Sequence, residues 1–529
     1  MLEMTSYMGQ LQYTRIKMSK SKNGLLSISG IMLLTLFGQL ISFVREAVFA
    51  AYYGVSVSAD AYVIAAQVPV TLFAVVGVSL TTTVLPIYTK KIKAEGNKEA
   101  NNFINNMISI FTIISILFVV IGVLFAPEIV NIFAPSFSQS AKLLTIKLTR
   151  IIFPIVIFSS LFNIYKAIHN AYESFFIPVI AVYIQSIVIS VAIILLGKKF
   201  GIYPAAIATV LAGALEMFFL AYTIRKKYVY KPYLNIFDSE IENVMKLIGP
   251  VILGVGIAEV NRVIDRMLAS GAGAGAVASI NYASKLINVF SGLLVSGLSV
   301  VCFQKFTELY AENKIDLLLS QFLKYIKLAG FFTIPISCGL LVMSNEAVTI
   351  VFGRGEFNES AAHSTSYVFL FYSLGLLFIV LRELGTKVFY AMHDTKTPMF
   401  NSAIGVGINI VLNIIFVKKM GAAGLALATS ISSFIICLLL FKALKKKQQK
   451  IQYKRVSVEL FKIILASAVM CICIVLSGKC LITFNIYLRS FLHVLLGCGV
   501  YFAVTYVLKS EVLMPGIDKV KKVITKKRN

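Results

Sequence analysis

The sequence predicts an all-α polytopic membrane protein of about fourteen transmembrane helices, arranged as two parallel six-helix repeats plus two C-terminal helices. Three observations predict this fold class. Hydrophobic residues make up 58% of the 529 residues and charged residues only 14%, against about a quarter in soluble chains. Apolar runs of about 20 residues, the length that crosses a bilayer, recur along the whole chain. The second half of the sequence also repeats the first.

Fourteen apolar runs are long enough to span the hydrocarbon core. The first follows a basic N-terminal stretch, but it lacks a small-residue cleavage site and many spans follow it, so we expect a helix rather than a removed signal peptide. The runs lie near 25–51, 62–88, 104–125, 143–165, 176–197, 201–224, 245–270, 280–303, 322–344, 365–390, 398–417, 421–441, 459–477 and 487–508.

A shift of 220 residues places much of the first half on the second. Pro178 falls on Pro398 and Gly201 on Gly421. Each half holds six spans, an even number, so the halves share one topology, as parallel repeats in secondary transporters do. The predicted segments are a basic cytoplasmic N-terminus (1–24), an N-lobe (25–227), a C-lobe (228–447), two added spans (448–510) and a basic cytoplasmic tail (511–529).

The net charge of +26 resides mainly in alternate loops between the apolar runs. This is the positive-inside pattern, so we expect no nucleic-acid partner and place both termini in the cytoplasm. The expected location is a bacterial cytoplasmic membrane, which the chain crosses many times. The basic segments are the N-terminus, Lys90 to Lys98, Arg225 to Lys231, Lys442 to Arg455 and Lys519 to Arg528.

Nothing in the sequence indicates catalysis. The seven Cys fall mostly in apolar runs with no metal-site spacing, the four His are scattered, and no phosphate-binding loop is present. We therefore expect that the protein is not an enzyme and holds no cofactor. Na⁺ or H⁺ could still act as a coupling ion for transport. A membrane-active enzyme and a non-transporting scaffold remain alternatives.

Several charges fall inside the predicted spans, where each costs a few kcal/mol and therefore usually faces a cavity or a partner. Arg45 and Glu46 lie late in the first span, and Asp60 opens the second. The repeat places Arg45 on Asp265 and Glu46 on Arg266, with the signs exchanged. Charge is thus expected on both sides of the interface between the halves, where transporters bind substrate.

Two arginines in the seventh span could form an anion site. Arg262 and Arg266 are four residues apart on one helical face, where like charges repel and a bound phosphate would relieve them. Alternatively, Glu259 and Asp265 neutralise them in a structural network. With Lys285, the intramembrane group carries equal numbers of positive and negative charges, so composition leaves both readings open.

Uncharged polar residues offer a second kind of site. Asn409 and Asn413 are four residues apart in the eleventh span and Thr429 lies in the twelfth; they could coordinate a cation or join helices by hydrogen bonds. Glu216 in the sixth span could be a proton site or a helix–helix hydrogen bond. The glycine-rich segment 271–275 follows a helix rather than a strand, so we expect an outer turn and no dinucleotide site.

Four motifs together resemble the MurJ/MviN family. Residues 40–61, LISFVREAVFAAYYGVSVSADA, resemble its opening signature, and residues 280–285, INYASK, its Tyr-Ala-Asp-Arg element. Residues 389–398, FYAMHDTKTP, and 421–430, GAAGLALATS, are similar to two later motifs. The resemblance covers roughly residues 30–510 and implies a flippase that carries lipid II, the undecaprenyl-diphosphate-linked peptidoglycan precursor, by alternating access between two six-helix lobes.

The resemblance also implies partners and site residues. The implied partners are a lipid-linked glycan, membrane lipids and cell-wall synthesis proteins, and the two extra helices are expected to border the lipid tail. Carried over motif by motif, and with the two arginines of the seventh span added, the substrate-binding candidates are Arg45, Glu46, Asp60, Arg262, Arg266 and Lys285. The implied sodium site comprises Asp265, Asn409, Asn413 and Thr429.

The chain also departs from the family pattern. Gln39 stands where an arginine is expected, the segment 68–74 lacks the usual paired arginines, and Ser284 replaces an aspartate. At least two cavity cations are therefore absent, which weakens binding to a diphosphate. Two alternatives follow: a flippase for another lipid-linked glycan (a capsule, teichoic or O-unit precursor), or a cation-coupled small-molecule exporter.

Overall fold

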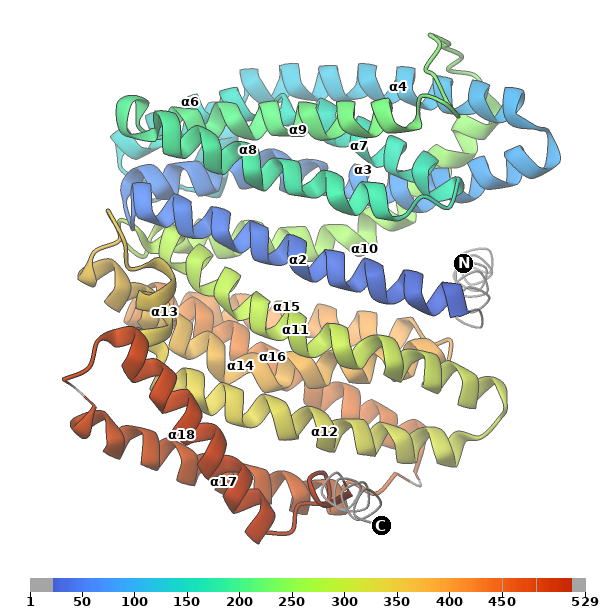
Figure 1. The fold of residues 1–529 in the computed structure, drawn as a ribbon. Helices are drawn as coiled ribbons and strands as arrows, with labels where there is room; N and C mark the ends of the chain where they lie inside the picture. Colours follow the sequence, from blue (N-terminus) through green and yellow to red (C-terminus); the bar gives the residue numbers. More distant parts are fainter. Residues whose placement is uncertain (1–21, 450, 482, 516–529) are drawn as a thin grey trace. The chain divides into compact units, whose positions relative to one another are not determined.

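The computed structural model describes residues 22–449, 451–481 and 483–515. Within these ranges the chain is almost entirely helical and forms no strand (Figure 1). Most of the predicted basic N-terminus (1–21) and most of the basic tail (516–529) lie outside the described residues. The helices are α2 (Lys22–Tyr53), α3 (Val57–Ala94), α4 (Asn97–Leu124), α5 (Ala126–Phe133), α6 (Gln139–Ile152), α7 (Ile155–Ala171), α8 (Phe176–Phe200), α9 (Tyr203–Ile224), α10 (Ser239–Ser270), α11 (Ala276–Ala311), α12 (Ile315–Val342), α13 (Ser344–Phe352), α14 (Glu359–Ala391), α15 (Lys396–Met420), α16 (Ala422–Lys447), α17 (Lys454–Cys480) and α18 (Ile486–Val507).

The predicted membrane fold is confirmed. In the described part, 11 helical segments are long and apolar enough to cross a membrane, with α6 and α7 forming one of them. These two helices are separated at Pro154, whose ring cannot continue the hydrogen-bond ladder. The long helices α3, α10 and α11, which carry the charged residues, bring the total to the expected fourteen.

Two short helices were not predicted. α5 and α13 have eight and nine residues, too few to cross a bilayer, and each follows a membrane-spanning helix after one residue. A search for runs of about 20 apolar residues cannot detect helices of this length.

The backbone repeats at the predicted offset of 220. α8 begins at Phe176 and α15 at Lys396, and the glycines that end them, Gly201 and Gly421, have φ of 61° and 56°. Both positions therefore need a residue that tolerates the left-handed region. Matching side chains also cap the preceding spans. The Ser138 hydroxyl accepts from Ala141 N, and Asn358 Oδ1 accepts from Ala361 N.

The chain divides into two compact units. One comprises Met1–Ala278 with Gly355–Phe357, and the other Ser279–Arg354 with Asn358–Asn529. α10 belongs to the first unit, where it packs against α3 and α5. The lobe boundary expected after residue 227 stays a prediction.

Each unit has its own core, built from equivalent positions. In the first, Ile168 and Leu220 are fully buried among aromatic residues of α3 and α4. In the second, the residues 220 positions later, Val388 and Leu440, are buried in the same way beside Phe322.

The last two helices form a hairpin on α12 (Figure 1, lower part). Phe331 and Ile334 of α12 pack against Met470 of α17 and Tyr501 of α18. Pro335 has no N–H, so the carbonyl of Phe331 four residues earlier lacks its helical donor. The Tyr501 hydroxyl donates to that carbonyl at 2.7 Å, which ties the hairpin to the helix at a polar group that would otherwise be unsatisfied.

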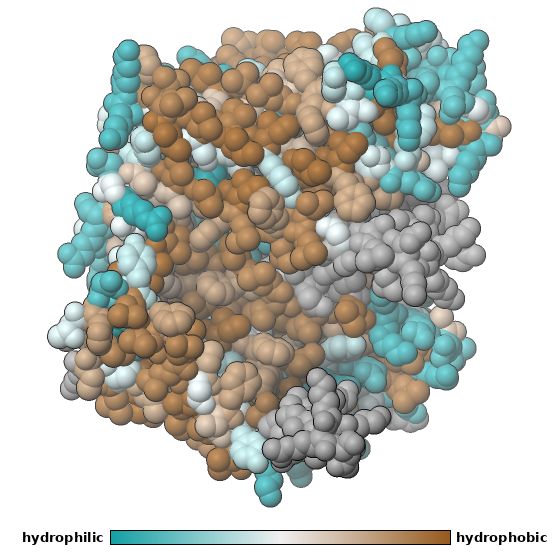
Figure 2. All heavy atoms as spheres, viewed as in Figure 1, coloured by the Kyte–Doolittle hydropathy of each residue, from teal (hydrophilic) through white to brown (hydrophobic). Residues whose placement is uncertain are grey.

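Surface composition agrees with a membrane environment. Figure 2 shows hydrophobic side chains covering the faces of the helices, with hydrophilic ones gathered at the helix ends. Large apolar residues such as Leu195, Phe218 and Phe461 are more than half exposed. In a soluble protein such surfaces would be aggregation-prone, whereas in a bilayer they contact lipid.

Candidate functional site

The first polar group of the site lies where α2, α3 and α9 meet. Arg45 Nη2 is 2.8 Å from Glu46 Oε1, and both side chains are largely buried. The guanidinium also interacts electrostatically with Tyr62 and Glu216. Tyr62 in turn shares a 2.9 Å hydrogen bond with the hydroxyl of Thr209. A buried charge is costly unless it is paired, so these partners hold Arg45 in place within the first unit.

Asp60 caps the start of α11. Its Oδ2 accepts from Gly275 N at 2.6 Å and its Oδ1 from Ala278 N at 2.7 Å. A carboxylate on the unsatisfied amides at a helix N-terminus is favoured by hydrogen bonding and by the helix dipole. Arg266 interacts electrostatically with the same carboxylate. Asp60 therefore has a structural role; its contact with substrate stays a prediction.

The segment 271–275 is the turn between α10 and α11, as expected. Gly273 and Gly275 have φ of 110° and 80°, which favours glycine at both positions. A Cβ on Gly275 would come within 2.2 Å of the Val55 side chain. The glycines thus permit a close approach of backbone to neighbouring residues rather than a nucleotide site.

The seventh-span charges are arranged along α10. Arg262 forms an ion pair with Glu259, and its side chain is 56% exposed. Asp265 Oδ2 accepts from Asn261 Nδ2 at 3.3 Å. The neutralising pair considered as an alternative to an anion site is therefore present for Arg262. The guanidinium nevertheless remains accessible to a ligand.

Lys285 lies on α11 in the second unit, whereas the other five substrate-binding candidates lie in the first. Its side chain is half-buried. Its place beside the arginines stays a prediction. Asp265 of the implied sodium site is likewise in the first unit, and the remaining three candidates are in the second.

Those three lie on the packed helices α15 and α16. Asn413 Nδ2 donates to Asn409 Oδ1 at 3.0 Å, and Asn409 Nδ2 is 3.4 Å from the Ser432 hydroxyl. Thr429 is one turn before Ser432 on α16. Both amides are buried, so this polar seam of Asn409, Asn413, Thr429 and Ser432 supplies neutral oxygens of the type that hard cations bind.

The described residues hold no cluster of three or more His, Cys, Asp or Glu that could bind a metal ion. A transition-metal centre is therefore not supported there. A weakly held alkali cation fits the amide and hydroxyl oxygens of the seam, because it does not require charged ligands.

Some members of the polar group were not among the predicted site residues. They are Tyr62, Thr209 and Ser432, which take part in the hydrogen bonds described above. A signal for two of them existed in the repeat, which places Tyr62 on Tyr282 and Thr209 on Thr429. Ser432 carried no such signal, because its counterpart in the first half is an alanine.

Comparison with known proteins identifies the family. The family described as lipid II flippase MurJ matches residues 49–495. A probable lipid II flippase MurJ of Rickettsia prowazekii is 25% identical over 505 residues, covering 91% of this chain and 97% of the relative. A lipid II flippase MurJ of Thermosipho africanus is 28% identical over 412 residues, covering 78% of this chain and 84% of the relative.

Solved structures agree. A structure of lipid II flippase MurJ in an inward closed conformation has a TM-score of 0.79 at 28% identity, covering 91% of this chain and 99% of that one. An inward-facing multidrug resistance MATE family transporter of the MOP superfamily has a TM-score of 0.58 at 18% identity, covering 79% and 96%. The second likeness shows a shared fold alone.

Proposed function

The chain belongs to the lipid II flippase MurJ family, and we propose that it carries lipid II across the bacterial cytoplasmic membrane. The observation that carries the proposal is the family match over residues 49–495, supported by named relatives that align along nearly their whole length. The match favours lipid II over another lipid-linked glycan or a small-molecule exporter. The chain is a transporter by family, and we propose that it has no enzymatic activity.

We propose that cations of the candidate site meet the diphosphate of the substrate. Phosphate groups bind arginine strongly because the guanidinium offers two parallel donors. Arg262 is accessible, and Arg45 is fixed by Glu46 within the first unit. Arg262 and Arg266 are the residues proposed to compensate for the arginines that the family pattern has and this chain lacks. Glu46 pairs with Arg45, and Asp60 caps the start of α11 and interacts electrostatically with Arg266.

Transport is proposed to follow alternating access, with both termini in the cytoplasm. The basic loops, including Lys442 to Arg455, support this orientation because translocation disfavours Lys and Arg. Na⁺ is the proposed coupling ion, and the oxygens of Asn409, Asn413 and Thr429 in the second unit are its proposed ligands. A bound Na⁺ would supply positive charge that stabilises one state of the transporter over the other.

Complementation tests the assignment. In bacteria depleted of their own lipid II flippase, the wild-type chain is expected to restore growth and to expose lipid II on the outer surface. Arg45→Ala and Arg262→Ala are expected to lower rescue at least tenfold at equal membrane levels, whereas the exposed loop variant Lys226→Ala is expected to rescue fully. A wild-type chain that reaches the membrane and does not rescue would overturn the lipid II assignment. Equal transport with Na⁺ or K⁺ in vesicles would remove the proposed coupling.

A further inference from the structure

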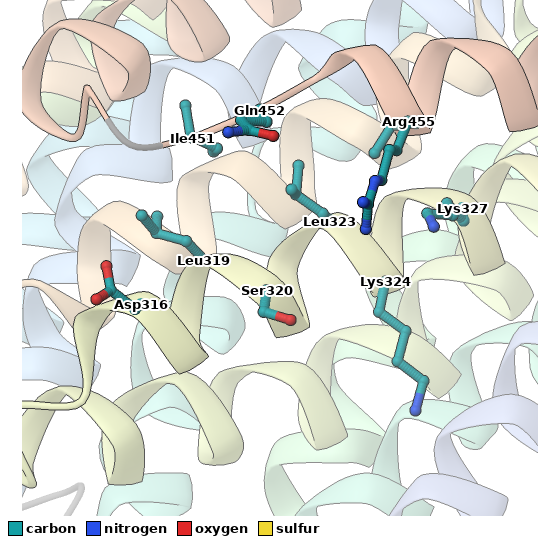
Figure 3. Close-up of a pocket in the computed structure, with 10 residues that line it drawn as sticks. Asp316, Leu319, Ser320, Leu323, Lys324, Lys327, Ile451, Gln452 and Arg455 are labelled. Carbon is teal, nitrogen blue, oxygen red and sulfur yellow. The ribbon is translucent and has the colours of Figure 1, made fainter.

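A cavity of about 460 Å³ lies between the first turns of α12 and the start of α17, within the second unit (Figure 3). Its inner wall is apolar, because Leu319, Ile451 and Val456 are buried there. Its outer wall is basic and polar. The lining residues on that wall are Lys324, Lys327, Arg455, Ser320, Gln452 and Asp316.

Positive charge dominates one end of the cavity. Figure 3 shows Arg455 extending from α17 toward α12, which carries Lys324 and Lys327. Lys327 pairs with Glu511, which also interacts electrostatically with Arg455. Lys324 is exposed, and no ion pair to it is present among the described residues. Lys327, Lys462 and Arg455 therefore share the Glu511 carboxylate, and Figure 3 shows Lys324 extending from α12 away from Arg455.

The acidic lining residue is too distant to cancel this charge. Asp316 lies in the first turn of α12, eight residues before Lys324. At 1.5 Å per residue, that separation is about 12 Å along the helix axis. The basic end is left with a net positive charge that an anion can neutralise.

The helix that carries Arg455 also has an apolar surface. Just beyond Arg455, α17 exposes Val458, Phe461 and Leu465, which are 55%, 66% and 44% accessible. These residues would contact lipid chains if α17 spans the membrane as its hydropathy indicates. A ligand in the cavity would therefore present an anion to Arg455 and Lys324 and an apolar portion to the α17 face.

We infer that this cavity binds the phosphate-bearing headgroup of an anionic phospholipid, from the leaflet on the side where α16 ends and α17 begins. Basic pockets between membrane helices select such headgroups, because each nearby Lys or Arg adds attraction to anionic lipid. Arg455 and Lys324 bind the phosphate oxygens, while Ser320 donates a hydrogen bond to the headgroup. The site is separate from the transport residues and does not depend on which substrate is carried.

The absence of tryptophan allows a direct test. In the full-length protein, Gln452→Trp places a single fluorophore in the cavity wall. The protein is reconstituted into nanodiscs of phosphatidylcholine containing a small fraction of brominated phosphatidylglycerol or brominated phosphatidylcholine, whose bromines quench nearby tryptophan. Brominated phosphatidylglycerol is expected to quench at a several-fold lower mole fraction.

Two double variants test whether Lys324 and Arg455 cause the preference for phosphatidylglycerol. Lys324→Gln with Arg455→Gln is expected to weaken the phosphatidylglycerol preference about fivefold for each charge removed. Lys93→Gln with Lys226→Gln removes the same charge from exposed positions elsewhere and is expected to leave the preference unchanged.

Three outcomes would overturn the inference. They are equal quenching by both lipids, an equal loss of preference in both double variants, and full relief of quenching by millimolar inorganic phosphate, which would assign the cavity to free phosphate. Persistence of the preference in excess phosphate, with loss only in the Lys324/Arg455 variant, supports a lipid headgroup.

Discussion

α4 and α12 occupy equivalent places in the two repeats and have 28 residues each, yet they face different surroundings. These two helices begin 218 rather than 220 residues apart, so equivalent places are counted from the first residue of each helix. Counted in this way, Ile113 on α4 matches Phe331 on α12; Ile113 is 52% exposed and Phe331 3%. α4 presents its apolar face outward, and α12 is covered by the terminal hairpin of α17 and α18. Of the two equivalent helices, α12 thus serves as the surface on which the hairpin packs. Gly330 and Pro335 are the clearest residues by which α12 differs from α4.

The largest expected effect comes from adding a bulky side chain to the α12 surface that packs against the hairpin. A Cβ on Gly330 would come within 2.3 Å of Leu460 Cδ2 on α17. Gly330→Leu is therefore expected to separate the hairpin from α12 and destabilise the protein by about 3 kcal/mol, the upper range for overpacking a core. The thermal midpoint in detergent would measure the loss.

The matched control is Thr112→Leu, at the equivalent place on α4. That side chain is only half-buried on a helix with no covering hairpin. A change of less than about 0.5 kcal/mol is expected there. Equal midpoints for the Gly330 and Thr112 variants would show that the hairpin does not depend on close packing at Gly330.

A second difference separates the α8–α9 pair from the α15–α16 pair. Ile189 and Ile193 are buried on α8 at the places that Asn409 and Asn413 occupy on α15. The same scaffold therefore has an apolar seam in the first repeat and a polar one in the second. A polar seam is retained only if its amides are hydrogen-bonded or bind a ligand, because buried unpaired amides are destabilising.

Exchanging the two seams tests this difference. Ile193→Asn buries an amide among apolar residues and is expected to lower stability by about 2 kcal/mol. Asn413→Ile removes the donor to the buried Asn409 Oδ1 and is expected to cost about 1–3 kcal/mol, while abolishing the increase of the thermal midpoint with Na⁺. A Na⁺-dependent increase that survives in Asn413→Ile would place the cation elsewhere.

The helices and their repeat could be predicted because both are visible in the sequence. The helices are visible as apolar runs, and the repeat is visible as an offset of 220 residues. The contacts of individual charges were not. Asp60 was predicted to meet substrate, and only the fold shows that its two oxygens cap α11. Sequence spacing suggested the Glu259–Arg262 pair, because residues three apart on a helix are neighbours. For partners far apart in the sequence, such as Arg45 and Glu216, spacing does not indicate that the side chains are close.

A smaller effect is expected where α18 binds α12. Tyr501→Phe removes the hydroxyl that donates to the Phe331 carbonyl, which should cost about 1 kcal/mol. Pro335→Ala restores a backbone donor to that carbonyl, so Tyr501→Phe should cost less in this background. A double-mutant cycle on thermal stability measures the coupling. Additive effects would mean that the tyrosine does not compensate for the proline.

The smallest effect concerns the turns that precede α8 and α15. In the second repeat Asp394 pairs with Lys447 and accepts from Thr397 N and Oγ1. In the first repeat Ser174 stands in its place, and Lys227 instead lies 4.9 Å from the centre of the Tyr172 ring. The same connection between a turn and the end of a later helix is thus ionic in one repeat and cation–π in the other.

Acid should distinguish these two connections. Burial favours the neutral form of Asp394, but hydrogen bonds from Lys447 and Thr397 outweigh it and lower the pKa below its ordinary value of 3.8. A lowered folded-state pKa contributes stability that is complete above the unfolded value and lost as the pH falls through the folded one. Asp394→Asn is therefore expected to cost less than about 1 kcal/mol at pH 7 and a smaller amount at pH 2.5. Tyr172→Leu, which removes the cation–π contact, should cost a similar amount at both values, because that contact does not involve a carboxylate. Thermal midpoints at the two pH values give the comparison, and an Asp394→Asn deficit that is equally large in acid would show that the carboxylate acts through packing rather than charge.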